Sequence, residues 1–145
     1  MNSPVNILAI VGSYRKGGII ERAVDEILAA ARKEGAVTRK ISLLDKHLEF
    51  CTNCRSCTQV AGKNYGVCIL DDDMAGLLQE IERADALVLA SPMNAGTVTA
   101  IMKRFIERLL PTGLGVLLRQ KPVAPENQNE HFSWPLPLHR AFLQD

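Results

Sequence analysis

The most distinctive chemistry in this 145-residue chain would come from four cysteines gathered in one short stretch. They are spaced C-x2-C-x2-C-x10-C, and the chain contains no other cysteine. Three sulfurs at two-residue intervals converge on a curled loop, and a fourth completes the set of four thiolates that an iron-sulfur or zinc site requires. The spacing leaves a cluster, a zinc ion and plain thiols as alternatives. The residues concerned are Cys51, Cys54, Cys57 and Cys68.

A second set of candidate residues follows the first strongly apolar segment of the chain. The stretch GSYRKGG, at residues 12–18, leads from that segment into a helical pattern. Backbone N–H groups and the positive end of a helix dipole would meet there, which suits a phosphate group. Ser13 adds a hydroxyl and Arg15 a guanidinium that can grip phosphate oxygens. Gly17 and Gly18 let the backbone turn tightly against a ligand.

A third set, SPMNAG at residues 91–96, follows another apolar segment. Pro92 favours extended backbone at Ser91, and Gly96 allows a ligand to approach the backbone closely. These two glycine-containing loops carry the candidate binding residues, so their positions in the fold decide whether they form one site.

The elements that must position these residues alternate between strands and helices. Two almost continuous apolar runs are typical of strands buried on both faces of a parallel sheet, and a more polar segment between them suits an edge strand. Three other segments repeat apolar residues at helical spacing. The expected strands cover residues 5–11, 37–43 and 86–90, and the expected helices cover residues 20–31, 74–81 and 98–109.

This alternation predicts an α/β fold with a doubly wound parallel sheet in the order 2-1-3. In that order the first and third strands are neighbours, and the winding direction reverses between them. A ligand crevice opens at their carboxyl ends, where the loops at residues 12–18 and 91–96 should meet. We interpret the acidic run at residues 71–73 as helix capping rather than as a cation site.

Two long stretches resemble a known family. GSYRKGGIIERAV and ADALVLASPMNAGTVTAIMKRFIERLL resemble the flavodoxin-like NAD(P)H-dependent FMN reductases over residues 5–112. The cysteine segment is similar to that of their iron-sulfur flavoprotein relatives. The resemblance implies that the first loop binds the FMN phosphate through the pattern G-S-x-R-x-x-G-x-[ST], on which Ser13, Arg15 and Gly18 fall. Ile20 stands where the family has a hydroxyl, so one phosphate donor is missing.

The resemblance places the second loop at the polar edge of the flavin ring, where reduction concentrates negative charge. Asn94 stands where many relatives carry an aromatic residue that stacks on the ring. Because a nicotinamide passes hydride directly to the flavin, we expect no side-chain acid or base and name no catalytic residue. The residues implied at the ring edge are Pro92, Met93, Asn94, Ala95 and Gly96.

For the cysteine segment the resemblance implies a [4Fe-4S] cluster, held by all four cysteines, that relays electrons to or from FMN. A zinc ion or plain thiols remain alternatives, because the last interval of ten residues is longer than in the iron-sulfur members of the family.

Composition narrows the class of partner. The chain has 17 basic and 16 acidic side chains, a net charge of +1, so it lacks the basic surface that binds nucleic acid or an anionic membrane. No apolar run reaches the ~18 residues of a membrane span, and the first residues lack the pattern of a signal peptide. We expect a cytoplasmic, soluble protein whose cysteines stay unpaired.

The end of the sequence differs from the rest. Residues 114–145 contain four of the seven prolines and show no sustained period. We expect residues 1–113 to form an incomplete flavodoxin-like FMN-binding domain, and residues 114–145 to be an irregular, divergent or frame-altered tail in place of the family's last strands. The sheet edge that this leaves uncovered favours a homo-oligomer.

The sequence therefore predicts an FMN-dependent oxidoreductase that takes electrons from NAD(P)H and passes them to an unidentified small-molecule or protein acceptor. Two alternatives stay open. One is a non-enzymatic electron carrier that uses flavin or an iron-sulfur cluster, and the other is a cofactor-free thiol or zinc-binding module.

Overall fold

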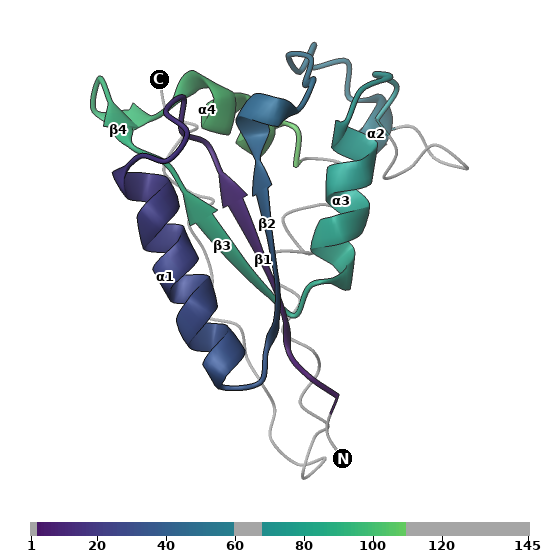
Figure 1. Cartoon of the computed structure of the whole chain (residues 1–145). Helices are drawn as coiled ribbons and strands as arrows, with labels where there is room; N and C mark the ends of the chain where they lie inside the picture. The colour runs from purple at the N-terminus through teal and green to yellow at the C-terminus, as the bar shows by residue number, and fades with distance from the viewer. Residues whose placement is uncertain (1–2, 60–67, 110–145) are drawn as a thin grey trace, which may run out of the picture.

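The structure is a computed structural model, and it describes residues 3–59 and 68–109 (Figure 1). The tail expected at residues 114–145 lies outside the described residues. None of the helices formed by the described residues is long and apolar enough to cross a membrane.

The main sheet has three parallel strands in the order β2-β1-β3, which confirms the predicted α/β class and strand order. The residue register places Ile10 of the central strand between Ile41 and Leu89. The strands are β1 (Asn6–Val11), β2 (Val37–Ser42) and β3 (Ala86–Ala90).

Helices cover both faces of this sheet, because alternate residues of β1 point to opposite sides. Ala9 and Val11 pack against Val24 and Leu28 of α1 (Ile19–Lys33). Leu8 and Ile10 belong to a larger core on the other face, with buried side chains of α3 (Met74–Arg83) and α4 (Ala100–Glu107). Figure 1 shows α1 on one side of the sheet and α3 on the other.

The described residues also form four shorter elements. A 3-10 turn, η1 (Leu43–Asp45), follows β2, and a single helical turn, α2 (Ser56–Gln59), lies within the cysteine segment. After β3 the chain forms a two-stranded antiparallel hairpin of β4 (Met93–Asn94) and β5 (Thr97–Val98). Sequence reasoning predicted only a loop there.

β3 is less buried than its apolar sequence predicts. All four residues from Leu8 to Val11 in β1 are at most 2% exposed, whereas Leu89 in β3 is 43% exposed. The difference follows from position, since β1 is central and β3 is at the edge of the described sheet.

Candidate functional site

A cavity of about 490 Å³ lies at the carboxyl ends of β1 and β3, where the sequence predicts the crevice. Both glycine-containing loops contribute to its wall. Ser13 and Asn94, which the prediction required to share one cavity, both line it. The described lining residues are Ser13, Tyr14, Arg15, Gly18, Ile19, Ile20, Pro92 and Asn94.

Strand pairing brings the two loops together. Val11 and Ala90, the last residues of β1 and β3, are register partners, and the next backbone N–H, that of Gly12, donates to the carbonyl of Ala90 at 2.8 Å. A Cβ on Gly12 would lie 2.7 Å from the Cβ of Met102 in α4. Glycine at position 12 is therefore what allows α4 to pack directly against the first loop.

Thr99 joins both loops to the start of α4. Its side chain is fully buried, and its hydroxyl donates to the carbonyl of Gly12 at 2.5 Å. The same oxygen accepts the backbone N–H of Met102 at 3.3 Å, as an N-cap does. The N–H of Thr99 donates to the hydroxyl of Ser91 at 3.0 Å. One threonine thus fixes the first loop, the second loop and the helix relative to one another.

The first loop is braced by its own side chains. The hydroxyl of Ser13, only 7% exposed, accepts the backbone N–H of Arg15 at 3.2 Å. Gly17 has φ +66 and donates its N–H to a carboxylate oxygen of Glu21 at 2.5 Å. This hydrogen bond, followed by one from Lys40, lowers the pKa of Glu21. Ser13 therefore shapes the loop instead of presenting a free hydroxyl.

Positive electrostatic character in the cavity comes from Arg15 and from the start of α1. Arg15 is exposed and, among the described residues, forms no ion pair. It is the one charged side chain among the described lining residues. The helix begins after Gly18 without a side-chain cap, so N–H groups of its first turn, at Ile19 and Ile20, have no partner within the helix. This end of the cavity suits an anion.

The other end of the cavity is formed by the chain entering the β4–β5 hairpin. Its two central residues, Ala95 and Gly96, have φ +49 and +79, as the two-residue turn of a hairpin requires. The turn holds Asn94 opposite Thr97 in the hairpin and leaves Met93 exposed.

A comparison with protein-family models adds to this geometry. The model described as NADPH-dependent FMN reductase matches residues 5–126. The chain belongs to this family.

Individual relatives agree with the assignment. The chain is 36% identical to an iron-sulfur flavoprotein of Archaeoglobus fulgidus over 114 residues, which are 79% of this chain and 50% of the relative. It is also 36% identical to an iron-sulfur flavoprotein of Methanocaldococcus jannaschii, over 81% of this chain and 58% of the relative. The chain thus spans between half and three fifths of the length of these two relatives.

Among solved structures, a protein described as flavone reductase is similar to this chain with a TM-score of 0.57. The sequence identity is 24%, over 74% of this chain and 30% of the other. This similarity supports the flavodoxin-like fold.

Some of the site residues predicted for this member of the FMN reductase family line the cavity, and others do not. Six of them lie in the cavity wall, namely Ser13, Arg15, Gly18, Ile20, Pro92 and Asn94. Four others, Gly17, Met93, Ala95 and Gly96, belong to the two loops but are not among the lining residues. Gly17, Ala95 and Gly96 have positive φ angles and shape the turns of the two loops.

Two lining residues, Tyr14 and Ile19, were missed by the sequence prediction. The hydroxyl of Tyr14 accepts the backbone N–H of Ile101 at 3.1 Å, which attaches the loop to the first turn of α4. Ile19 is exposed at the first position of α1. Their position between Gly12 and Ile20 could have indicated that they line the site. They were not predicted because neither tyrosine nor isoleucine is typical of phosphate binding.

The four cysteines are free thiols that share one neighbourhood. Burial raises the pKa of Cys57, and the charges of the other three cysteines raise it further. Left-handed backbone at Asn53 and Arg55, with φ +52 and +61, curls the chain around Cys54. Among residues 3–59 and 68–109 no three His, Cys, Asp or Glu side chains lie close enough together to hold a metal ion. The four cysteines match a tetrathiolate centre in donor type and number, but in this arrangement their sulfurs are too far apart to share one metal ion.

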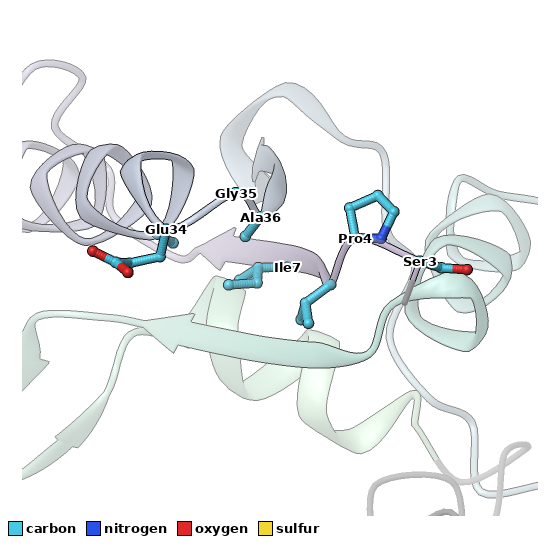
Figure 2. A pocket seen from close by; sticks show the side chains of 8 residues that line it. Ser3, Pro4, Ile7, Glu34, Gly35 and Ala36 are labelled. Atoms are coloured by element: carbon cyan, nitrogen blue, oxygen red, sulfur yellow. The ribbon is translucent and has the colours of Figure 1, made fainter. Parts of the chain in front are cut away.

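A second cavity, of about 530 Å³, lies at the opposite end of the sheet (Figure 2). Ser3, Pro4 and Ile7 line it together with Glu34 and Gly35, beyond the last turn of α1. Its one charged lining side chain among the described residues is the carboxylate of Glu34. A negative charge beside the carbonyl end of a helix is unsuited to a phosphate, so the cavity between the two loops is the better candidate for FMN.

Proposed function

We propose that this family member binds FMN in the cavity between residues 12–20 and 92–94, and uses it to pass electrons from NAD(P)H to an acceptor. The observation that carries the proposal is the charge distribution of that cavity. A cation and the start of a helix lie at one end, and no acidic side chain is among the described lining residues. Its volume of about 490 Å³ falls within the range of cofactor sites, roughly 300–1,000 Å³.

The polarity of the cavity suggests how FMN would lie. The phosphate would be held by the guanidinium of Arg15 and by the first-turn N–H groups at Ile19 and Ile20. The ring would then extend toward Pro92 and Asn94 at the β4–β5 hairpin. Asn94 offers an amide to the polar edge of the ring in place of a stacking aromatic side chain.

When bound, FMN supplies the redox chemistry, since it accepts hydride from a nicotinamide and releases the electrons to an acceptor. The side chains of this chain bind and orient. Tyr14, Ile19 and Ile20 supply the apolar part of the wall on the phosphate side, and Thr99 keeps the two loops at a fixed separation. The family description names NADPH, and we propose a nicotinamide as the donor on that basis.

A comparison of FMN with riboflavin tests the phosphate assignment, because the two ligands differ only in the phosphate. Fluorescence titration of Arg15→Gln should show FMN binding weakened by about tenfold or more, since a charge-assisted hydrogen bond contributes about 1.5–3 kcal/mol. Riboflavin binding should be unchanged. Lys16→Gln is the matched control, because Lys16 pairs with Asp45 outside the lining residues. Equal effects of the two substitutions, or equal effects on both ligands, would refute the assignment.

We also propose a [4Fe-4S] cluster at Cys51, Cys54, Cys57 and Cys68. The support is the set of four neighbouring thiols and the iron-sulfur flavoproteins among the relatives. Such a cluster would exchange single electrons with the flavin. Iron and sulfide analysis after anaerobic reconstitution should give four of each per chain, and a Cys57→Ser variant should lose them. Zinc bound in place of iron, or no metal at all, would contradict this second proposal.

A further inference from the structure

Arg108 is a buried cation that the flavin cavity does not use. It follows α4 as its C-cap, and its side chain is 1% exposed. Both of its terminal nitrogens bind the carboxylate of Asp72, with Nη1 at 2.7 Å from Oδ2 and Nη2 at 3.1 Å from Oδ1. Nη1 also donates to the carbonyl of Glu49 at 2.8 Å, and the N–H of Glu49 donates to Asp72 at 2.7 Å. The three residues form a closed set of hydrogen bonds.

These contacts join the two ends of the cysteine segment. Glu49 precedes the first cysteine by two residues, and Asp72 follows the last by four. Next to them, the backbone N–H of Asp73 donates to the carbonyl of His47 at 3.0 Å, and the N–H of His47 donates to the carboxylate of Asp73 at 2.8 Å. We call residues 47–49 and 72–73 the neck of the cysteine segment.

Arg108 stays charged in spite of its burial. Burial alone would lower its pKa, but hydrogen bonding to Asp72 raises it.

A second arginine, one turn earlier in α4, adds to the positive charge. Nη1 of Arg104 donates to the carbonyl of Leu48 at 2.8 Å, and its guanidinium lies 3.8 Å from the ring centre of Phe50. The Nε atoms of Arg104 and Arg108 are both buried without a hydrogen-bond partner among the described residues. Arg104 thus holds residues 48 and 50, at and beside the neck, against α4.

We propose that Arg108 is the positioning residue of the cysteine segment, because it holds the two ends of that segment together at the neck. This closing role stands on the contacts above, and its consequence for metal binding rests on the proposed cluster. Since Thr99 lies at the other end of α4, one helix connects the neck to the loops of the flavin cavity.

Three variants separate the closing role from general stability. Arg108→Lys keeps the charge but loses the planar fork. The double variant Arg108→Met/Asp72→Leu removes both buried charges and replaces them with apolar side chains, a change that folds tolerate. Lys103→Ala is the control on the same helix, because Lys103 is exposed and pairs only with Glu107 among the described residues.

The first readout is amide hydrogen exchange in the metal-free chain. The reporter is the N–H of Asp73, which donates to the carbonyl of His47 across the neck. We expect its exchange to accelerate by at least about tenfold in the double variant and to stay at the wild-type rate in Lys103→Ala. The N–H of Met102, which bonds to Thr99, should keep its rate in all variants. Unchanged exchange at Asp73 in the double variant would overturn the closing role.

The second readout is iron retention after reconstitution with Fe²⁺ and sulfide, followed by challenge with EDTA. We expect wild type and Lys103→Ala to hold iron equally, Arg108→Lys to release it about tenfold faster, and the double variant to retain none.

Fluorescence titration with FMN should give the same affinity for all four proteins, which shows that the flavin site is intact. Wild-type retention by the double variant would overturn the effect of Arg108 on metal binding. This result would leave the FMN proposal unaffected.

Discussion

Ile20 lies in the wall of the cavity, within the first turn of α1, where its side chain supplies an apolar surface and no hydrogen-bond donor. The neighbouring hydroxyl, that of Ser13, is engaged with the backbone of Arg15. The proposed phosphate would therefore be held mainly by the guanidinium and backbone N–H groups, and a hydroxyl introduced at position 20 should add to them.

We predict that Ile20→Thr tightens FMN binding by about tenfold, because a hydrogen bond to a charged group contributes about 1.5 kcal/mol or more. Riboflavin, which lacks the phosphate, should bind as before. Fluorescence titration with both ligands measures the effect. Ile27→Thr, an exposed position further along the same helix, is the control and should change neither affinity. Tightening of both ligands alike would count against a phosphate near residue 20.

Asp72 makes folding stability depend on pH. Burial by itself would raise its pKa, but hydrogen bonds from Arg108 and from the N–H groups of Glu49 and Met74 hold that pKa below the usual value. A carboxyl whose pKa is lower in the folded state stabilises the fold above the unfolded-state pKa. It loses that contribution as the pH falls through the folded-state pKa.

We therefore predict that the free energy of unfolding of the wild type decreases as the pH is lowered below about 4, the ordinary pKa of an aspartate. Asp72→Asn should be less stable than the wild type at neutral pH and should depend less on pH in this range. Urea unfolding at a series of pH values measures both slopes. Parallel slopes for the two proteins would contradict the assignment.

At the level of elements, Thr99 connects three segments that are far apart in the sequence. It caps α4, bonds to Gly12 after β1 and bonds to Ser91 after β3. Together with the pairing of β1 and β3, Thr99 therefore helps to set the separation of the two loops and the shape of the cavity between them.

We predict that Thr99→Val, which keeps the shape but removes the hydroxyl, costs about 1–2 kcal/mol of stability and weakens FMN binding. Thr99→Ser, which keeps the hydroxyl, should restore most of both. Urea unfolding and FMN titration measure the two effects. Thr97→Val, at an exposed position in β5, is the control and should change little. A Thr99→Val protein that binds FMN normally would show that the loops do not need this connection.

The elements with strong apolar periodicity were predictable from the sequence, and the connections between them were not. The helical spacing of Ile20, Val24 and Leu28 corresponds to α1, and the apolar run from Ala86 to Ala90 corresponds to β3. The β4–β5 hairpin was missed because its turn has Ala95 rather than asparagine at the first left-handed position, so the usual signal is absent.

Long-range polar contacts were equally unpredictable from the sequence. Arg108 lies three residues after Phe105, on the buried side of α4, but as a charged residue it is not part of the apolar pattern that predicted the helix. Its partner Asp72 is 36 residues away, and nothing in the local sequence pairs the two. The acidic run was correctly interpreted as capping in part, since Asp72 accepts the N–H of Met74 at 3.0 Å. Its ion pair with Arg108 was not foreseen.

On the scale of the whole molecule, the features that bear on function gather at one end of the sheet. The β4 hairpin, α2 and α4 all lie at the end where β1 and β3 terminate (Figure 1). α4 begins beside the flavin loops and ends at the neck of the cysteine segment. At about 1.5 Å per residue its eight residues span about 12 Å, so the two proposed redox sites would be neighbours.

The central claim is that both loops hold one FMN molecule, and backbone amide chemical shifts during an FMN titration test it most directly. The account predicts that the amides of Arg15, Ile19, Ile20 and Asn94 shift together and saturate at one FMN per chain, while those of Glu34 and Ala36 at the opposite cavity stay in place. Shifts confined to one loop, or centred on Glu34 and Ala36, would contradict the account.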